Sequence, residues 1–235
     1  MKLFVFGSSS SGNAYALEFE DGQILLLEAG LSYTNVYRAF PDRWKDIIGC
    51  LLSHEHGDHA KYVKDYDNNG ISIYGSIGTM EVVGVGLKHG KPFNTNTVSN
   101  IGINKSFYAF AVKHTAADPV GYLIFDRDTK ESLLFITDTS FFKPHFTGVS
   151  YIMVECNHIR SDPNHPWSES HLNLDKCLEF LKACDLKKTR KIILIHLSDS
   201  SSNEKLMVET IRNATSIDTV AATKGLVVYL HQDPF

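Results

Sequence analysis

Short apolar runs alternate along this chain with polar turns and with amphipathic segments. In the first half, such runs predict strands over 2–6, 14–20, 23–27, 47–52 and 71–74. Tyr15, Leu17 and Phe19 alternate with smaller or acidic residues, which indicates a strand with one buried face. Asp21-Gly22 predicts a tight hairpin before the third strand. Helical patterns follow over 31–40, 60–66 and 77–85.

The second half of the chain also alternates predicted strands with amphipathic segments, but it does not repeat the sequence of the first half. Apolar runs predict strands over 107–112, 120–125, 133–136, 149–154, 192–195 and 226–230. The segment 174–184 predicts an amphipathic helix, because Leu174, Cys177, Leu178 and Leu181 share one face, and 204–212 predicts another helix. The chain contains no low-complexity linker.

Metal-binding residue types gather where these apolar runs end. The densest group is Ser53-His54-Glu55-His56-Gly57-Asp58-His59, directly after the run at 47–52. Further along, the predicted strands end at His114, at Asp138, at Glu155-Cys156-Asn157-His158 and at His196. One histidine or carboxylate at the end of each of several strands is how an α/β scaffold assembles a site at one edge.

This pattern predicts bound divalent metal, because imidazole together with carboxylate suits zinc or a similar ion. His54 and His56, two positions apart, can reach one ion from an extended segment, whereas Asp58 and His59, beyond the turn at Gly57, suit a second ion. Taken singly, each later residue also has a structural explanation, such as a strand cap or a turn. Together they give seven candidate ligands: His54, His56, Asp58, His59, His114, Asp138 and His196.

The amino-acid composition narrows the class of protein but does not indicate a function. Hydrophobic residues at 43% and charged residues at 21% are typical of a globular protein, and no apolar run is long enough to span a bilayer. The N-terminal residues predict a first strand instead of a secretory signal. Four cysteines without a Cys-x-x-Cys pair indicate reduced thiols and a cytoplasmic location. The net charge of −4 argues weakly against a nucleic-acid coat, but two bound ions would reverse the local sign.

The pattern His-x-His-x-Asp-His at His54–His59 resembles the signature of the metallo-β-lactamase superfamily. The resemblance covers nearly the whole chain and implies one domain over 1–235, of α+β class, with an αββα four-layer sandwich. It implies that His54, His56 and His114 hold one metal, that Asp58, His59 and His196 hold a second, and that Asp138 bridges them. Di-iron relatives typically have glutamate where this chain has His56, so oxygen chemistry is a minor alternative.

Further blocks resemble the WalJ/YycJ-like branch, which is associated with exonuclease-type cleavage of phosphodiesters in DNA metabolism. They are Gly7-Ser8-Ser9-Ser10-Ser11-Gly12-Asn13-Ala14, the 53–59 cluster, the segment 114–122 and Glu155–His158. Two departures stand out: Glu28 replaces the usual aspartate before glycine, and an insertion lies around 161–168. The segment 171–196 also resembles ribonuclease Z, in which a histidine opens a helix at the place of His171.

These resemblances imply a binuclear hydrolase, most simply a phosphodiesterase or nuclease that uses a metal-bridging hydroxide. The cofactors would be two divalent ions, zinc or manganese, and the partner a DNA or RNA substrate, with no membrane. Asp58 would both ligate and orient the nucleophile, and His171 would protonate the leaving oxygen, unless it is only a helix-start histidine. The basic stretch 182–191 would meet a nucleic-acid backbone or simply be solvated, and the Ser8–Ser11 turn would touch phosphate or be an ordinary hairpin.

Two other classes of function stay open at this point. One is a small-molecule metallohydrolase acting on cyclic nucleotides, thioesters or lactams with the same site. The other is a non-catalytic binding module, which has no reason to keep seven candidate ligands. The sequence gives neither the oligomeric state nor the choice between exonuclease and endonuclease.

Overall fold

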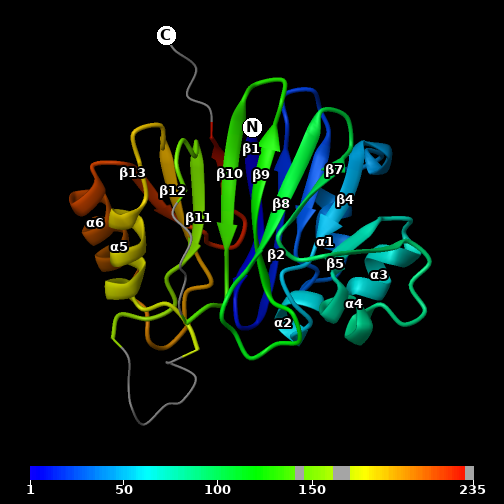
Figure 1. Ribbon diagram of the computed structural model, residues 1–235, viewed down its shortest axis with the longest axis horizontal. Coiled ribbons are helices and arrows are strands. Elements are labelled where there is room, and N and C mark those ends of the chain that lie inside the picture. The colour runs from blue at the N-terminus through cyan, green and yellow to red at the C-terminus, as the bar shows by residue number, and fades with distance from the viewer. Residues whose placement is uncertain (141–145, 161–169, 231–235) are drawn as a thin grey trace.

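Two seven-stranded sheets lie face to face in the computed structural model, which describes residues 1–140, 146–160 and 170–230 (Figure 1). The first sheet has the order β14-β1-β2-β3-β4-β5-β6. Its strands are β1 (Lys2–Ser9), β2 (Gly12–Glu18), β3 (Ile24–Leu27), β4 (Ile47–Leu51), β5 (Ile73–Ser76), β6 (Gly90–Phe93) and β14 (Val227–Tyr229). Strands β14, β1, β2 and β3 are antiparallel, and β3 to β6 are parallel.

The second sheet has the order β13-β12-β11-β10-β9-β8-β7. Its strands are β7 (Thr97–Ile101), β8 (Lys105–Ala111), β9 (Val120–Asp126), β10 (Glu131–Ile136), β11 (Tyr151–Glu155), β12 (Lys191–Ile195) and β13 (Asp218–Ala221). Strands β10, β11, β12 and β13 run parallel to one another. Parallel strands end at one edge of a sheet, so the residues after β10, β11 and β12 lie side by side.

Helices cover the outer face of each sheet (Figure 1). On the first sheet they are α1 (Thr34–Ala39), α2 (Gly57–Ala60), α3 (Val63–Asn68) and α4 (Ile77–Val83), with a 3₁₀ turn at Trp44–Asp46, and on the second they are α5 (Leu174–Ala183) and α6 (Glu204–Thr215). Among the described residues, no helix is long and apolar enough to cross a membrane.

Three apolar layers hold this arrangement together. The central layer lies between the sheets and includes Tyr15, Tyr122 and Phe135. A second layer packs Ile152 and Leu194 of the second sheet against Cys177 of α5 and neighbouring side chains. A third layer joins the first sheet to α1, α3 and α4. The αββα four-layer sandwich expected from the sequence is therefore confirmed.

A buried lysine links the two sheets at the end away from the metal-binding residue types. Lys105 of β8 is 1% exposed, and its Nζ lies 2.7 Å from Asp21, 3.1 Å from Asp126 and 2.8 Å from Asp128. Burial alone lowers the pKa of Lys105, but the bonds to these carboxylates outweigh it and raise the pKa above its usual value. Lys105 is therefore charged, and its carboxylate partners compensate that charge.

The sequence did not predict the strands β6, β7 and β13. All three lie at or next to sheet edges, where side chains are polar or half exposed and no apolar run marks a strand. The predicted helix 60–66 is instead the short helices α2 and α3, because the backbone N–H of Tyr62 donates to the carbonyl of Ala29 between them. The predicted helix 31–40 begins only at Thr34.

Candidate metal centre

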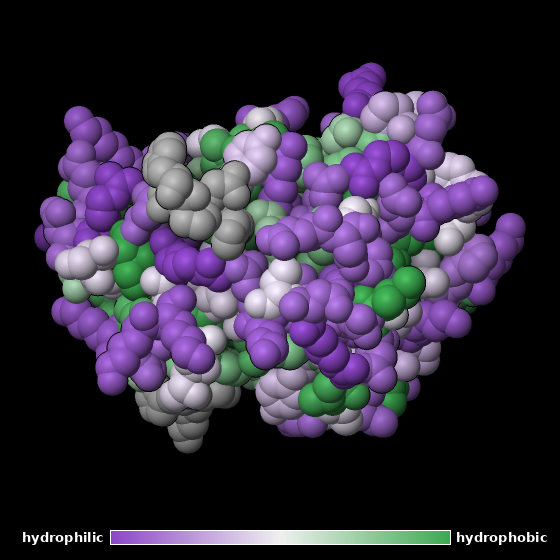
Figure 2. Space-filling view, turned by 90° about the horizontal axis from the view of Figure 1, so that it is seen from above, coloured by the Kyte–Doolittle hydropathy of each residue, from purple (hydrophilic) through white to green (hydrophobic). Residues whose placement is uncertain are grey.

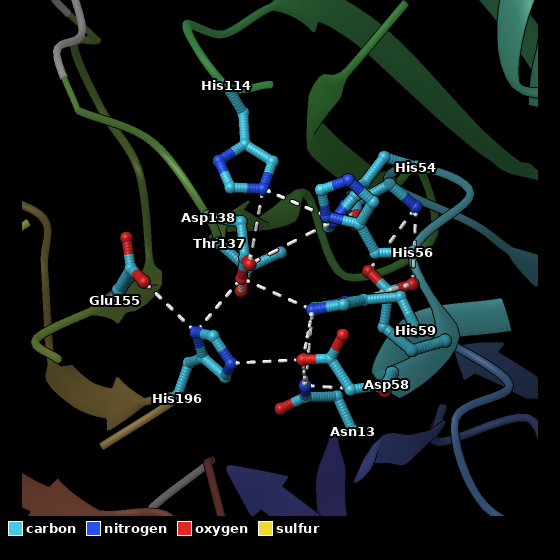
Figure 3. A network of polar contacts seen from close by, with 12 residues as sticks. Asn13, His54, His56, Asp58, His59, His114, Thr137, Asp138, Glu155 and His196 are labelled. Carbon is cyan, nitrogen blue, oxygen red and sulfur yellow. Dashed lines mark hydrogen bonds and ion pairs between the residues drawn. The ribbon is translucent and has the colours of Figure 1, made fainter. Parts of the chain in front are cut away.

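The seven predicted ligands come together at one edge of the sandwich (Figure 3). His54 and His56 follow β4, while Asp58 and His59 lie in the short helix α2 that begins after His56. His114, Asp138 and His196 follow β8, β10 and β12, so that both sheets contribute. Their ligand atoms form two groups, within each of which all atoms lie within 4.8 Å of one another.

The first group consists of His54, His56 and His114. The Nε2 atom of His114 lies 3.1 Å from Nδ1 of His56, and the ring of His54 stands 4.6 Å from that of His56. Burial and the neighbouring His59 lower the pKa of His54 well below its usual value, and burial lowers the pKa of His114. Neutral imidazoles keep the lone pair that a metal ligand needs.

The second group consists of Asp58, His59, Asp138 and His196. Asp58 Oδ2 lies 3.2 Å from His59 Nε2 and 3.3 Å from His196 Nε2, and Asp138 Oδ1 lies 3.3 Å from His59 Nε2. The other oxygen of Asp138 faces the first group, at 3.9 Å from His54 Nε2 and 3.6 Å from His114 Nε2. Asp138 therefore stands between the two groups.

The donor atoms fit divalent cations. The Nε2 atom of His54 is buried and makes no hydrogen bond within the described part of the chain, although buried polar atoms are nearly always paired. Burial raises the pKa of Asp58, but hydrogen bonds from His196 and His59 outweigh it and lower that pKa, so this carboxylate is ionised at neutral pH. Nitrogen and carboxylate donors in this number suit two ions such as zinc.

Glu155 and His171 form a pair beside the second group. The Nδ1 atom of His171 lies 2.6 Å from Glu155 Oε1, and the same oxygen lies 3.0 Å from Nδ1 of His196. The other oxygen of Glu155 accepts hydrogen bonds from the backbone N–H groups of Thr139 and Leu172. Burial lowers the pKa of His171, but the Glu155 carboxylate outweighs it and raises the pKa above its ordinary value. The sequence suggested His158 as the hydrogen-bonded partner of Glu155, but the carboxylate pairs with His171 and His196, and Nδ1 of His158 lies 3.3 Å from Oδ1 of Asn157.

Glu28, the departure from the usual aspartate, lies fully buried behind His59. Its Oε2 atom is 3.6 Å from Nδ1 of His59, and its carboxylate accepts a hydrogen bond from the backbone N–H of Ser53. It therefore contacts a predicted ligand through the ring nitrogen that points away from the other ligands. The longer side chain still reaches the motif that begins at Ser53.

The serine-rich turn between β1 and β2 makes hydrogen bonds to two of the candidate ligands. Ser8 Oγ accepts a hydrogen bond of 2.9 Å from the backbone N–H of His196 and one of 2.7 Å from the hydroxyl of Tyr15. Asn13 Nδ2 donates to Oδ2 of Asp58 at 3.3 Å. The turn is a hairpin, as expected, but Ser8 is occupied with His196, and this role was not predicted from the sequence.

The backbone at the site is held in an uncommon conformation. Glu28, Asp138 and His196 have positive φ angles of 65°, 41° and 53°. Non-glycine residues in the left-handed region cost on the order of 1–3 kcal/mol each and persist only where surrounding contacts impose them. The hydrogen bond from Ser8 to His196 is one such contact.

Members of both ligand groups line a cavity of about 510 Å³ that opens to the surface. Its walls are formed by Ser10, His56, Asp58, His114, Thr115, Asp138, Asn157, Ser170, His171, His196, Ser198 and Ser200. This volume lies within the range of roughly 300–1,000 Å³ that is typical of small-ligand sites. A substrate in the cavity would contact both ligand groups and His171.

The αββα sandwich and the convergent histidine and aspartate groups define a metal-dependent hydrolase of the metallo-β-lactamase fold. Residues 25–197 match the family described as the beta-lactamase superfamily domain, and the chain belongs to this family. The matched range contains all seven predicted ligands and His171.

Known proteins resemble the chain over most of its length. It is 28% identical over 229 residues to the exodeoxyribonuclease YycJ of Bacillus anthracis, covering 86% of this chain and 84% of that protein. The metallo-beta-lactamase fold protein YhfI of Bacillus subtilis superposes with a TM-score of 0.80 at 18% identity, over 97% of this chain and 99% of the other. Human tRNase Z, short form, superposes with a TM-score of 0.73 at 15% identity, over 99% and 100%. The resemblances noted in the sequence are thereby confirmed.

Proposed function

We propose that this chain is a binuclear metal-dependent phosphodiesterase that cleaves nucleic acid. The observation that carries the proposal is that one cavity is lined by members of both groups of metal-ligating residues and by His171, which pairs with Glu155. The similarity to an exodeoxyribonuclease over 86% of the chain supports a phosphodiester substrate. Zinc suits the donor set best, and manganese is the alternative.

In this proposal His54, His56 and His114 hold one cation, Asp58, His59 and His196 hold the other, and Asp138 lies between them. Bound divalent cations lower the pKa of water and neutralise negative charge on phosphate oxygens. The Asp58 carboxylate lines the cavity and orients the attacking water as a hydrogen-bond acceptor, besides its role as a ligand. Hydrolysis then forms a bond from the water oxygen to phosphorus and breaks the bond from phosphorus to the sugar oxygen.

We propose His171 as the acid that protonates the departing sugar oxygen. Glu155 engages its Nδ1 atom and raises its pKa, so the ring carries a proton nearer neutral pH than an isolated histidine does. His171 lines the cavity, and its second ring nitrogen remains for the substrate. The products are a phosphate monoester and a sugar hydroxyl.

A substrate panel tests the proposed function. Single- and double-stranded DNA and RNA, a cyclic dinucleotide, a thioester and a lactam are offered to the metal-loaded protein. The proposal predicts turnover of nucleic acid. Turnover of only the thioester or the lactam would contradict it, and turnover of the cyclic dinucleotide alone would indicate a signalling phosphodiesterase. No turnover of any substrate by the metal-loaded protein would favour a binding module.

His171→Ala separates the acid role from a merely electrostatic one. A sugar hydroxyl leaves poorly unless it is protonated, whereas p-nitrophenolate leaves readily. The variant should therefore lose roughly 10²- to 10⁴-fold in kcat on DNA and much less on bis-p-nitrophenyl phosphate, with metal content unchanged. The control is His89→Ala, since His89 pairs with Asp67 outside the cavity. Equal losses on both substrates would leave His171 with a role in binding phosphate charge.

A further inference from the structure

A second cavity adjoins the metal cavity. Its volume is about 350 Å³, and Ser198 lines both cavities. The walls come from the β1–β2 turn, from the segment after His196, and from the segment after β13. The lining residues are Phe6, Gly7, Ser8, Ser9, Ser11, Gly12, Leu31, Leu197, Ser198, Asp199, Ser202, Glu204, Ala221, Ala222, Thr223 and Lys224. This volume also lies within the range of roughly 300–1,000 Å³ that is typical of small-ligand sites.

Among the described residues, neither cavity is lined by the cluster of lysine and arginine side chains that a long polyanion needs, so bound metal ions would be the main positive charge there. No lysine or arginine is among the described residues that line the metal cavity, whose other polar groups are mainly serine and threonine hydroxyls. Lys113 and Arg160 lie near lining residues in the sequence but do not line the cavity themselves. In the second cavity a single base, Lys224, is outnumbered by the exposed carboxylates of Asp199 and Glu204. Affinity for long nucleic acids comes mostly from lysine and arginine contacts to phosphates.

The basic stretch 182–191 lies too far away to supply this charge. Lys191 begins β12 and His196 follows its end, so the five residues of the strand separate them by about 16 Å at roughly 3.3 Å per residue. Arg190 is paired with Glu131, and Lys191 with Asp218. The end of the molecule at which β12 begins is turned toward the viewer in Figure 2 and is largely hydrophilic. Lys191 is therefore too far from His196 to contact the scissile phosphodiester, and contact of the basic stretch with a more distant part of a nucleic-acid backbone stays a prediction.

We propose that the site acts on the end of short oligonucleotides, with the terminal nucleoside in the second cavity and the adjoining phosphodiester in the metal cavity. This inference rests on the proposed phosphodiesterase function and specifies its substrate. The side chains of Phe6, Leu31 and Leu197 offer apolar surface to a base, and the hydroxyls of Ser9 and Thr223 offer hydrogen bonds to uncharged sugar and base groups.

The two carboxylates explain why the substrate ends in this cavity. A strand that continued through it would carry further phosphates past Asp199 and Glu204, with only Lys224 to compensate. Like charges that face each other across a binding surface disfavour the wrong partner. A terminal nucleoside brings no phosphate beyond the cleaved one, so it meets hydroxyls and apolar side chains without this repulsion.

Substrate length and salt dependence test the proposal. Deoxythymidine oligonucleotides of 3 and 30 residues, labelled at either end, are cleaved at fixed metal concentration. The expected kcat/KM is at least tenfold higher for the trimer. With one lysine contact the KM should rise only about threefold between 50 and 200 mM salt, against several hundredfold for six contacts. A 30-mer cleaved as well as the trimer, or with the steeper salt dependence, would overturn the proposal and leave the phosphodiesterase function standing.

Two variants test the cavity itself. Thr223→Trp narrows it and should raise the KM of the trimer at least tenfold, with hydrolysis of bis-p-nitrophenyl phosphate unchanged. Val227→Trp, an exposed position outside the cavity, is the matched control. Asp199→Lys combined with Glu204→Gln should let a strand continue through the cavity, so the end-labelled 30-mer should give internal cleavage products that the wild type does not give, while kcat/KM for the trimer stays nearly constant. An unchanged KM in the first variant, or an unchanged set of 30-mer products in the second, would contradict the assignment. Absence of all phosphodiester turnover would contradict the proposed function instead.

Discussion

The hydrogen bonds of Ser8 tie the first hairpin to a residue 188 positions away, and their removal gives a quantitative test. Ser8→Ala removes the acceptor of the His196 backbone N–H and of the Tyr15 hydroxyl. A buried donor left without a partner lowers the free energy of unfolding by about 1–3 kcal/mol. Because the Tyr15 hydroxyl keeps its bond to Asn13, the two donors together should lower it by about 2–4 kcal/mol. Tyr15→Phe removes one donor and should cost about 1–2 kcal/mol.

The double variant separates a shared network from two independent effects. In Ser8→Ala with Tyr15→Phe only the His196 N–H lacks its partner, so the total cost should fall below the sum of the single costs by about 1–2 kcal/mol. Urea unfolding of the four proteins measures this coupling. Ser9→Ala is the control, because Ser9 in the same turn accepts only the N–H of Ser11 in the described hydrogen bonds.

Metal affinity gives a second measure of the same contact. The His196 backbone has a φ of 53°, and the bond from Ser8 helps to hold it there. Loss of a group that orients a ligand typically lowers metal affinity about 10- to 100-fold, so Ser8→Ala should show this loss in competition with a chelator. Additive unfolding costs together with unchanged metal affinity would show that Ser8 does not hold His196 in place.

The remaining predictions concern the bridge and the buried lysine. Asp138→Ala should abolish activity and lower the content of both metals, as elemental analysis would show, because this carboxylate faces both ligand groups; full metal content would exclude the bridging role. Lys105→Met should lower the free energy of unfolding at pH 7 by about 3–5 kcal/mol, since it leaves the buried Asp126 without its cationic partner. Lys105 lowers the pKa of Asp128, and it also lowers that of Asp21 against the effect of burial. Both carboxylates therefore stabilise the fold above about pH 4 and lose that contribution as the pH falls further. The gap between wild type and variant in urea unfolding should shrink below about pH 4, and a constant gap would show that these carboxylates are not coupled to Lys105.

Local patterns were sufficient to predict which residues gather at the candidate metal centre, but not the contacts that hold these residues in place. Apolar runs mark β10 and β12, so Asp138 and His196 could be predicted to follow two strands, and the parallel pairing through β11 then brings them together. Nothing near Ser8 in the sequence signals that its hydroxyl meets the backbone of His196. The Glu155–His171 pair was missed for the same reason, since it joins a strand end to a helix start across a segment that includes an insertion.

The edge strands and the basic stretch show a second limit of the sequence. Strands β7 and β13 are half exposed and contain polar residues, so the hydrophobic pattern does not separate them from loops. The sequence already places Lys191 and His196 at opposite ends of one strand, but the pairing of Arg190 with Glu131 and of Lys191 with Asp218 depends on the assembled structure.

The number of metal equivalents at which activity saturates tests the binuclear site most directly. Protein stripped of metal is titrated with zinc, and separately with manganese, while hydrolysis of bis-p-nitrophenyl phosphate is followed. The two ligand groups, both of which Asp138 faces, predict a rate that rises until two equivalents per chain are bound. Saturation at one equivalent, or a rate independent of added metal, would contradict the binuclear site.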